Sequence, residues 1–184
     1  GITNCIILDV KGELLYKCGL KLKNDGYTIR VLNLKDPELS DRYNPFAYIE
    51  KEEDLIKLIA NIQQSLTPPD SMSNDPFWQQ GVALYLQSTF YYEWFMAKEE
   101  GRTATFNNVL KLINDETKYD TSVEVEEGEK PPTILQMKMN AISEKYGEDN
   151  PAVRDYRKLK EGATETVRSI IVITNAMLKL CETK

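Results

Sequence analysis

The residues best suited to chemistry in this sequence are three charged side chains of one short turn, Asp9, Lys11 and Glu13. An apolar, β-branched run over residues 2–8 stops at Asp9, and the chain then turns through Lys11 and Gly12. In open α/β sheets, a carboxylate at the carboxyl end of a strand can hold a magnesium-bound water, and a lysine near a helix start can contact an anion. One hypothesis therefore places Asp9 and Lys11 beside a nucleotide phosphate, with Glu13 close by.

The same turn also has a purely structural interpretation. Asp9 can accept hydrogen bonds from backbone N–H groups at a helix start, and Gly12 supplies backbone freedom. No glycine falls into the pattern G-x-x-x-x-G-K-[ST], and the sequence has no histidine, the commonest general base and zinc ligand. We therefore predict no catalytic residue and no metal site within this chain, and leave both interpretations of the turn open.

The elements that must position this turn are a strand, a helix and a second strand. Residues 2–8 and 27–32 are β-branched runs, and residues 13–24 carry apolar side chains at helical spacing before Gly26. This order within about thirty residues is typical of a βαβ unit with parallel strands. Because two strands make a poor sheet, we expect the chain to be one piece of a longer protein.

The pattern changes after a turn-rich segment over residues 35–46, where helical periodicity begins and continues along the chain. We therefore predict two parts. Residues 1–43 form a strand–helix–strand piece, and residues 44–184 form an all-α domain. The predicted fold class is mainly α, a helical bundle preceded by a short βαβ remnant of a larger α/β domain.

The centre of the predicted bundle is a helix over residues 77–98, which is apolar nearly all round. Asp75 and Pro76 form its start, as an N-cap followed by proline at the first helical position. Phe77 and Trp78 could anchor a partner, but core packing is the ordinary interpretation of aromatic residues in such a helix. Further helices are predicted over residues 55–66, 105–113, 133–146, from 151 onward and 164–181.

Composition narrows the class of protein further. The chain is 41% hydrophobic and 28% charged, and no apolar run approaches the roughly 20 residues that a bilayer requires. Three cysteines, Cys5, Cys18 and Cys181, lie in apolar surroundings and form no C-x-x-C motif. Their odd number favours reduced thiols in a cytoplasmic setting.

The net charge of −6 is concentrated in one stretch, residues 115–129, which has seven acidic residues against Lys118 alone. Its low apolar content predicts a loop, either a solvating linker or a docking segment for a basic partner. A smaller basic stretch follows and is either a solvated helix face or a surface for DNA phosphate or an acidic tail. Its members are Arg154, Arg157, Lys158 and Lys160, interrupted by Asp155.

The order of several short motifs resembles one protein family. Residues 8–14, Leu-Asp-Val-Lys-Gly-Glu-Leu, are similar to the DPKGEL signature of type IV secretion coupling proteins, the TraG/TraD-like conjugation ATPases. Val10 stands where that family usually has proline. Further matching words are Gly26-Tyr27, Val31-Leu32-Asn33-Leu34, Tyr43-Asn44-Pro45-Phe46 and Asp75-Pro76-Phe77-Trp78, followed by Tyr156, Gly162, Thr166, Ser169 and Ile170.

The resemblance implies a place within a larger motor. In that family, a hexameric ATPase anchored in the bacterial inner membrane has a RecA-like domain interrupted by an all-α domain that faces the cytoplasm. The chain would lie between the Walker A loop and the Walker B strand, so residues 1–43 would belong to the RecA-like domain. ATP and magnesium are implied for the full-length protein, whereas no cofactor is predicted for this piece.

The resemblance also implies a function for residues 44–184, the recognition of a transferred substrate. We predict a non-catalytic domain that binds a relaxase or relaxosome accessory protein, DNA or a secreted protein, beside other secretion-channel subunits. The overall negative charge favours a protein partner over bare DNA. The predicted partner-binding residues are Glu124, Glu126, Glu127, Arg154, Arg157 and Lys158. The alternatives are a nucleotide-binding ATPase fragment that uses Asp9 and Lys11, and a helical interaction module of an unrelated pathway.

Overall fold

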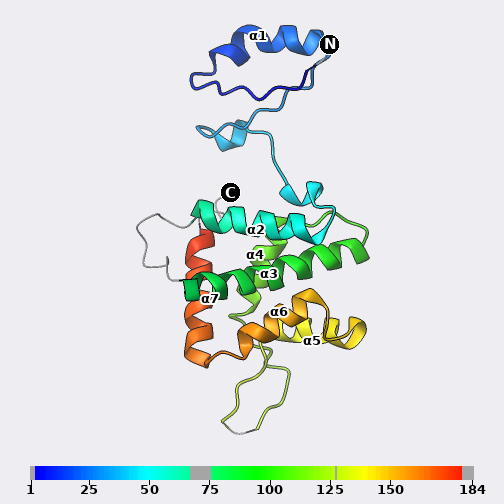
Figure 1. The fold of residues 1–184 in the computed structure, drawn as a ribbon, viewed down its shortest axis with the longest axis vertical. Helices are drawn as coiled ribbons and strands as arrows, with labels where there is room; N and C mark the ends of the chain where they lie inside the picture. Colours follow the sequence, from blue (N-terminus) through cyan, green and yellow to red (C-terminus); the bar gives the residue numbers. More distant parts are fainter. Residues whose placement is uncertain (1–2, 67–75, 127, 180–184) are drawn as a thin grey trace. The chain divides into compact units, whose positions relative to one another are not determined.

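The structure of the chain, a computed structural model, describes residues 3–66, 76–126 and 128–179 (Figure 1). These residues are mainly helical, as predicted, and none of them lies in a β-strand. The chain divides into two compact units, Gly1–Tyr43 and Asn44–Lys184, which are called unit 1 and unit 2. The nucleotide-binding and recognition roles expected for the two parts stay predictions.

The described residues of unit 1 contain one α-helix, α1 (Glu13–Asn24), and one short 3-10 helix, η1 (Pro37–Leu39). Gly12 precedes α1 with φ of 74°, a conformation that glycine adopts without the Cβ clash of other residues. Asp36 caps η1 by accepting a hydrogen bond from the N–H of Glu38, and Pro37 fills the first helical position.

The two strands predicted on either side of α1 are not shown by the structure. Residues 3–8 and 27–32 lie outside any strand and share no ladder of backbone hydrogen bonds among the described residues. The second segment instead turns back on the end of its own unit, where the Val31 N–H donates to Asp41 Oδ2 over 2.7 Å. A β-branched run becomes a strand only when another strand pairs with it. The local pattern therefore predicted two strands that unit 1 does not form among its described residues.

Unit 2 is built from six α-helices and the 3-10 helix η2 (Pro45–Tyr48) within its described residues. The α-helices are α2 (Glu52–Leu66), α3 (Pro76–Glu99), α4 (Phe106–Asp115), α5 (Ile134–Tyr146), α6 (Pro151–Lys160) and α7 (Thr164–Leu178). Thr105, Thr133 and Asn150 are the N-cap residues of α4, α5 and α6, and the side chain of each accepts a backbone N–H at the start of its helix. Asp75, predicted as an N-cap, and Cys181 lie outside the described residues.

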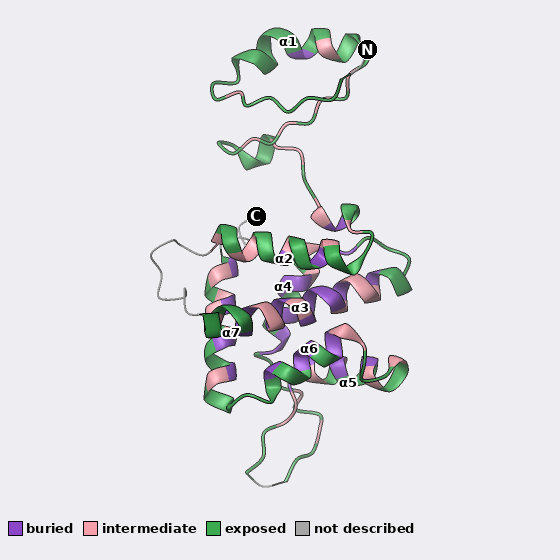
Figure 2. Ribbon diagram, in the orientation of Figure 1, coloured by how far each residue is buried: buried purple, intermediate pink, exposed green. Residues whose placement is uncertain are grey.

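Helix α3 is the buried centre of unit 2, which confirms the prediction drawn from its apolar sequence. It packs against α2, α4, α6 and α7, and buried residues occupy its middle part in Figure 2, while its two ends are exposed. Phe90 is fully buried, with its ring 5.4 Å from that of Phe46 and 5.8 Å from that of Phe106. The first aromatic pair of α3 is less enclosed, since Trp78 is half-buried and Phe77 is exposed.

A close approach between α3 and α7 explains one glycine of the central helix. A Cβ placed on Gly81 would lie 2.5 Å from Ile170 Cδ1, too close for any real contact. On α7, Val167, Ile170, Thr174 and Leu178 are buried. The pattern of α7 and the small residue of α3 therefore fit one helix crossing (Figure 1).

Candidate functional site

The turn at Asp9 forms a helix start in unit 1. Asp9 Oδ2 accepts a hydrogen bond from the N–H of Leu15 over 2.9 Å, and the Asp9 carbonyl accepts one from the N–H of Gly12 over 3.3 Å. The carboxylate thus satisfies a backbone donor in the first turn of α1, where four such donors lack partners within the helix. This geometry agrees with the structural interpretation of the turn, in which Asp9 accepts a backbone N–H at a helix start.

The other two charged side chains of this turn do not converge on Asp9. Glu13 pairs with Lys17 over 3.4 Å on the exposed surface of α1, and Lys11 is exposed with no ion pair to any described residue. Nowhere in the described ranges do three acidic or cysteine side chains group as metal ligands. A complete site for ATP and magnesium needs a phosphate cradle and convergent oxygen ligands. The expectation that this chain holds no cofactor stays a prediction.

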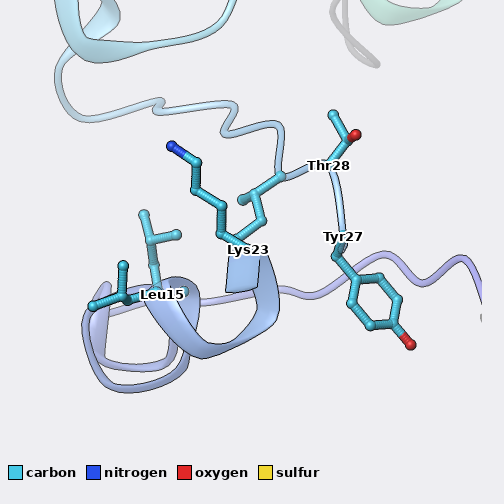
Figure 3. Close-up of a pocket in the computed structure, with 7 residues that line it drawn as sticks. Leu15, Lys23, Tyr27 and Thr28 are labelled. Atoms are coloured by element: carbon cyan, nitrogen blue, oxygen red, sulfur yellow. The ribbon is translucent and has the colours of Figure 1, made fainter. Parts of the chain in front are cut away.

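A shallow groove of about 560 Å³ lies beside α1 in unit 1 (Figure 3). Its lining residues are Leu15, Gly19, Leu20, Lys23, Tyr27, Thr28 and Ile29. A Cβ on Gly19 would lie 3.2 Å from Leu15 Cδ1 of the same helix and 3.9 Å, an ordinary contact distance, from Ile29 Cδ1. The lining carries one charged group, Lys23, so the groove offers apolar contact and no acid–base pair.

The basic residues predicted on α6 are largely held by partners within unit 2. Arg154 Nε lies 3.0 Å from Asp155 Oδ1, and Asp155 is buried. Arg157 contacts Glu148 over 2.7 Å and donates to Ser143 Oγ over 3.1 Å. Lys158 differs from both arginines, since it is exposed and has no ion pair with the described part of the chain.

The acidic stretch forms a loop whose stem is closed by backbone hydrogen bonds. The N–H of Ile134 donates to the carbonyl of Lys118 over 2.8 Å, and the N–H of Asp120 donates to the carbonyl of Pro132 over 3.0 Å. Tyr119 and Thr133 form an antiparallel bridge at the same level. The name acidic loop is used for residues 117–132. Its described residues, 117–126 and 128–132, extend away from the helices of unit 2 in Figure 1.

The carboxylates of this stretch fall into two groups with different surroundings. Asp115 contacts Lys118 over 3.0 Å and Lys138 over 2.6 Å; burial raises its pKa, but the hydrogen bonds of these two lysines outweigh that effect and leave the pKa below its ordinary value. The second group comprises Glu124, Glu126 and Glu129, which are exposed and make no ion pair with described residues. Glu127, also predicted as a partner-binding residue, lies outside the described residues.

Glu116 is a buried carboxylate that the sequence did not distinguish from its acidic neighbours. Its Oε2 accepts hydrogen bonds from Thr133 Oγ1 over 3.0 Å and from the Tyr156 hydroxyl over 2.7 Å. Lys160 Nζ lies 2.8 Å from its Oε1. Burial, followed by the charge of Glu116, raises the pKa of Tyr156 far above its ordinary value, so the hydroxyl stays a donor. Three residues therefore meet at one carboxylate, Thr133 at the start of α5 and both Tyr156 and Lys160 on α6.

Glu93 is a second buried carboxylate and closes the connection between α3 and α4. It accepts hydrogen bonds from Arg102 Nη2 over 3.0 Å, the N–H of Thr105 over 3.0 Å and Asn108 Nδ2 over 3.1 Å. Burial raises its pKa, but these hydrogen bonds and the Arg102 charge outweigh burial and leave the pKa below its ordinary value. No periodicity marks Glu93, which stands among apolar residues of α3.

These features define a helical unit that exposes acidic side chains on its loop and basic side chains on α6. The smaller unit contains the Asp9 turn. No α-helix in the described ranges combines the length and the apolar character needed to cross a bilayer. The sequence matches the family described as Type IV secretory system Conjugative DNA transfer over residues 2–181.

This match spans almost the whole chain, and the chain belongs to this conjugative DNA transfer family. The resemblance inferred from the Asp9 turn and the motifs after it is thereby confirmed. No curated protein and no solved structure gives a significant match to the chain.

Proposed function

We propose that unit 2 is a substrate-recognition domain of a conjugative coupling protein and carries out no catalytic step by itself. Membership of the conjugative DNA transfer family supports a role in the transfer process. The helical architecture of unit 2 supports a binding role, because its buried polar groups are engaged in holding helices together. In this proposal the partner is a relaxase or a relaxosome accessory protein, and unit 2 faces the cytoplasm.

The observation that carries the proposal is the unpaired negative charge of the acidic loop. Glu124, Glu126 and Glu129 are exposed and make no ion pair with the described residues, whereas Glu93 and Glu116 are buried with basic partners. Unneutralised charge at the end of a loop produces a field that attracts a basic protein surface and raises its association rate. The same charge repels DNA phosphates.

The basic face of α6 makes a smaller contribution to the proposed surface. Arg154 and Arg157 already contact Asp155 and Glu148, so a partner would have to compete with these ion pairs. Lys158 is the residue of this face that a partner could contact without such competition among described residues. The proposal therefore ranks the acidic loop first and Lys158 second as points of contact.

The test measures binding of the full chain to the purified relaxase of the same conjugative system, and compares variants that carry substitutions in unit 2. The triple variant Glu124→Gln, Glu126→Gln, Glu129→Gln removes three charges from the loop. The matched control removes three exposed charges elsewhere, with Asp149→Asn, Glu144→Gln and Glu161→Gln. We expect the loop variant to weaken binding about tenfold at low salt, mainly through slower association, and the control to change it less than about twofold.

Equal binding by the two triple variants would remove the loop from the recognition surface. A stronger effect of Lys158→Ala than of the loop variant would move the surface to α6. Binding of single-stranded DNA that survives physiological salt would favour a nucleic-acid partner instead of a protein.

ATP and magnesium are proposed to act only in the complete hexameric protein, together with other secretion-channel subunits. The Asp9 turn supports this view, because its carboxylate accepts the N–H of Leu15 and makes no ion pair with Lys11. Calorimetric titration of ATP with magnesium into this chain is expected to show no binding. Measurable affinity that is lost in Lys11→Ala would favour the nucleotide-binding alternative.

A further inference from the structure

Glu116 occupies the point where both ends of the acidic loop leave the helices of unit 2. It is the C-cap residue of α4 and directly precedes the loop, and it accepts the hydroxyl of Thr133, the N-cap residue of α5 that directly follows the loop. The Glu116 carboxylate therefore connects the two residues that flank the acidic loop, Glu116 before it and Thr133 after it. Its side chain is 2% exposed, so water does not compete for these contacts.

The same carboxylate fixes the stem to α6. Tyr156 and Lys160 reach it from successive turns of that helix, over 2.7 and 2.8 Å. Thr133 is constrained twice, because its hydroxyl donates to Glu116 and also accepts the N–H of Gln136 over 3.1 Å. Loss of the carboxylate would remove the side-chain link between the two ends of the loop, and the backbone hydrogen bonds around the Tyr119–Thr133 bridge would then have to close the stem without it.

We propose that Glu116 is the positioning residue of the acidic loop. Its buried carboxylate holds the two stem segments against α6, so that the exposed acids of the loop project from one fixed place on unit 2. The consequence for partner binding rests on the proposed function, while the consequence for the stem does not. A flexible loop would have to be ordered on binding, and a fixed stem reduces this cost.

Glu93 provides a matched control for a role that is merely structural. It is also a buried carboxylate with three partners, and its cation Arg102 is 35% exposed, as Lys160 is 34% exposed beside Glu116. Its contacts lie at the start of α4, at Thr105 and Asn108, and none of them is part of the acidic loop. Glu93→Gln therefore weakens the same unit by the same kind of change without touching the stem.

The experiment is amide hydrogen exchange of the full chain for Glu116→Gln and Glu93→Gln. In Glu116→Gln we expect the N–H groups of Asp120 and Ile134 to exchange about tenfold faster than in the wild type, because their stem bonds open locally. In Glu93→Gln, the exchange rates of the Asp120 and Ile134 N–H groups should change by no more than those of the other amides of unit 2. Equal changes in both variants, or none in Glu116→Gln, would overturn the proposal.

A second variant keeps the test decisive if Glu116→Gln fails to fold. Tyr156→Phe removes one hydrogen bond to Glu116 and keeps the buried ring, and it should accelerate the same two stem amides by a smaller factor. Relaxase binding is then measured on the folded variant. A loosened stem with unchanged binding would contradict the proposed function and leave the positioning role intact, whereas an unchanged stem would contradict the positioning role whatever the binding.

Discussion

Units 1 and 2 have similar apolar side chains in their sequences but bury them to very different extents. Among the described residues of unit 1, only Gly19 is buried, and Ile6, Leu8 and Leu34 are between 85% and 104% exposed. In unit 2, by contrast, Phe90 is fully buried within a continuous core. A hydrophobic pattern therefore predicts which side chains need burial, but burial itself requires several elements that pack together.

The difference follows from the number of surfaces that each unit can bring together. Helix α3 is enclosed by four other helices, so side chains on every side of it find apolar neighbours. Helix α1 faces a groove that is open to solvent, with Leu20 on its lining still 73% exposed. Unit 1 would need further protein surface, from any source, before its apolar residues could contribute to stability.

The largest expected effect tests whether the two units differ in this way in solution. Phe90→Ala should lower the free energy of unfolding by about 3–5 kcal/mol, because it removes a fully buried ring that contacts Phe46 and Phe106. Leu20→Ala in unit 1 should change it by less than about 0.5 kcal/mol. Urea denaturation followed by far-UV circular dichroism measures both. A comparable loss for Leu20→Ala would show that unit 1 buries this residue.

An intermediate effect is expected at the ion pair between Glu93 and Arg102 in unit 2. Glu93→Gln should lower the free energy of unfolding by about 1–3 kcal/mol, less than for a fully buried pair because Arg102 is 35% exposed. The folded-state pKa of Glu93 is below its ordinary value, so its stabilisation is present above about pH 4.3 and is lost as the pH falls further. Thermal unfolding between pH 7 and pH 3 should therefore depend less on pH in Glu93→Gln.

The control for this pH dependence is Glu144→Gln, an exposed residue without an ion pair among those described. Its pH profile should match that of the wild type. If Glu93→Gln and Glu144→Gln give the same profile, the hydrogen bonds to Arg102, Thr105 and Asn108 do not stabilise unit 2 as the structure indicates.

The smallest expected effect concerns the turn in unit 1. Asp9→Ala removes the side chain that accepts the N–H of Leu15, and the loss of such a helix cap costs about 1 kcal/mol locally. Amide exchange at Leu15 should become faster, while the unfolding of unit 2 should stay the same. An unchanged rate at Leu15 would show that this cap is not formed in solution and would reopen the chemical interpretation of Asp9.

Much of unit 2 could be predicted from local sequence because its helices begin and end on local signals. Thr105, Thr133 and Asn150 accept N–H groups two or three residues later, so their role depends on neighbours in the chain. The central position of α3 also followed from its own composition. The short motifs around the Asp9 turn identified the family for the same reason, since a motif is a run of neighbouring residues.

The sequence by itself determined the helices of unit 2, the acidic loop and the family. The tertiary structure alone decided that residues 3–8 and 27–32 form no paired strands, and that Glu116 is buried while Glu124 is exposed. Glu116 meets Thr133 across 17 residues and Lys160 across 44, and no local pattern encodes contacts over such separations. Pairing and burial depend on which distant surfaces meet, whereas helix formation depends mainly on residues within one turn.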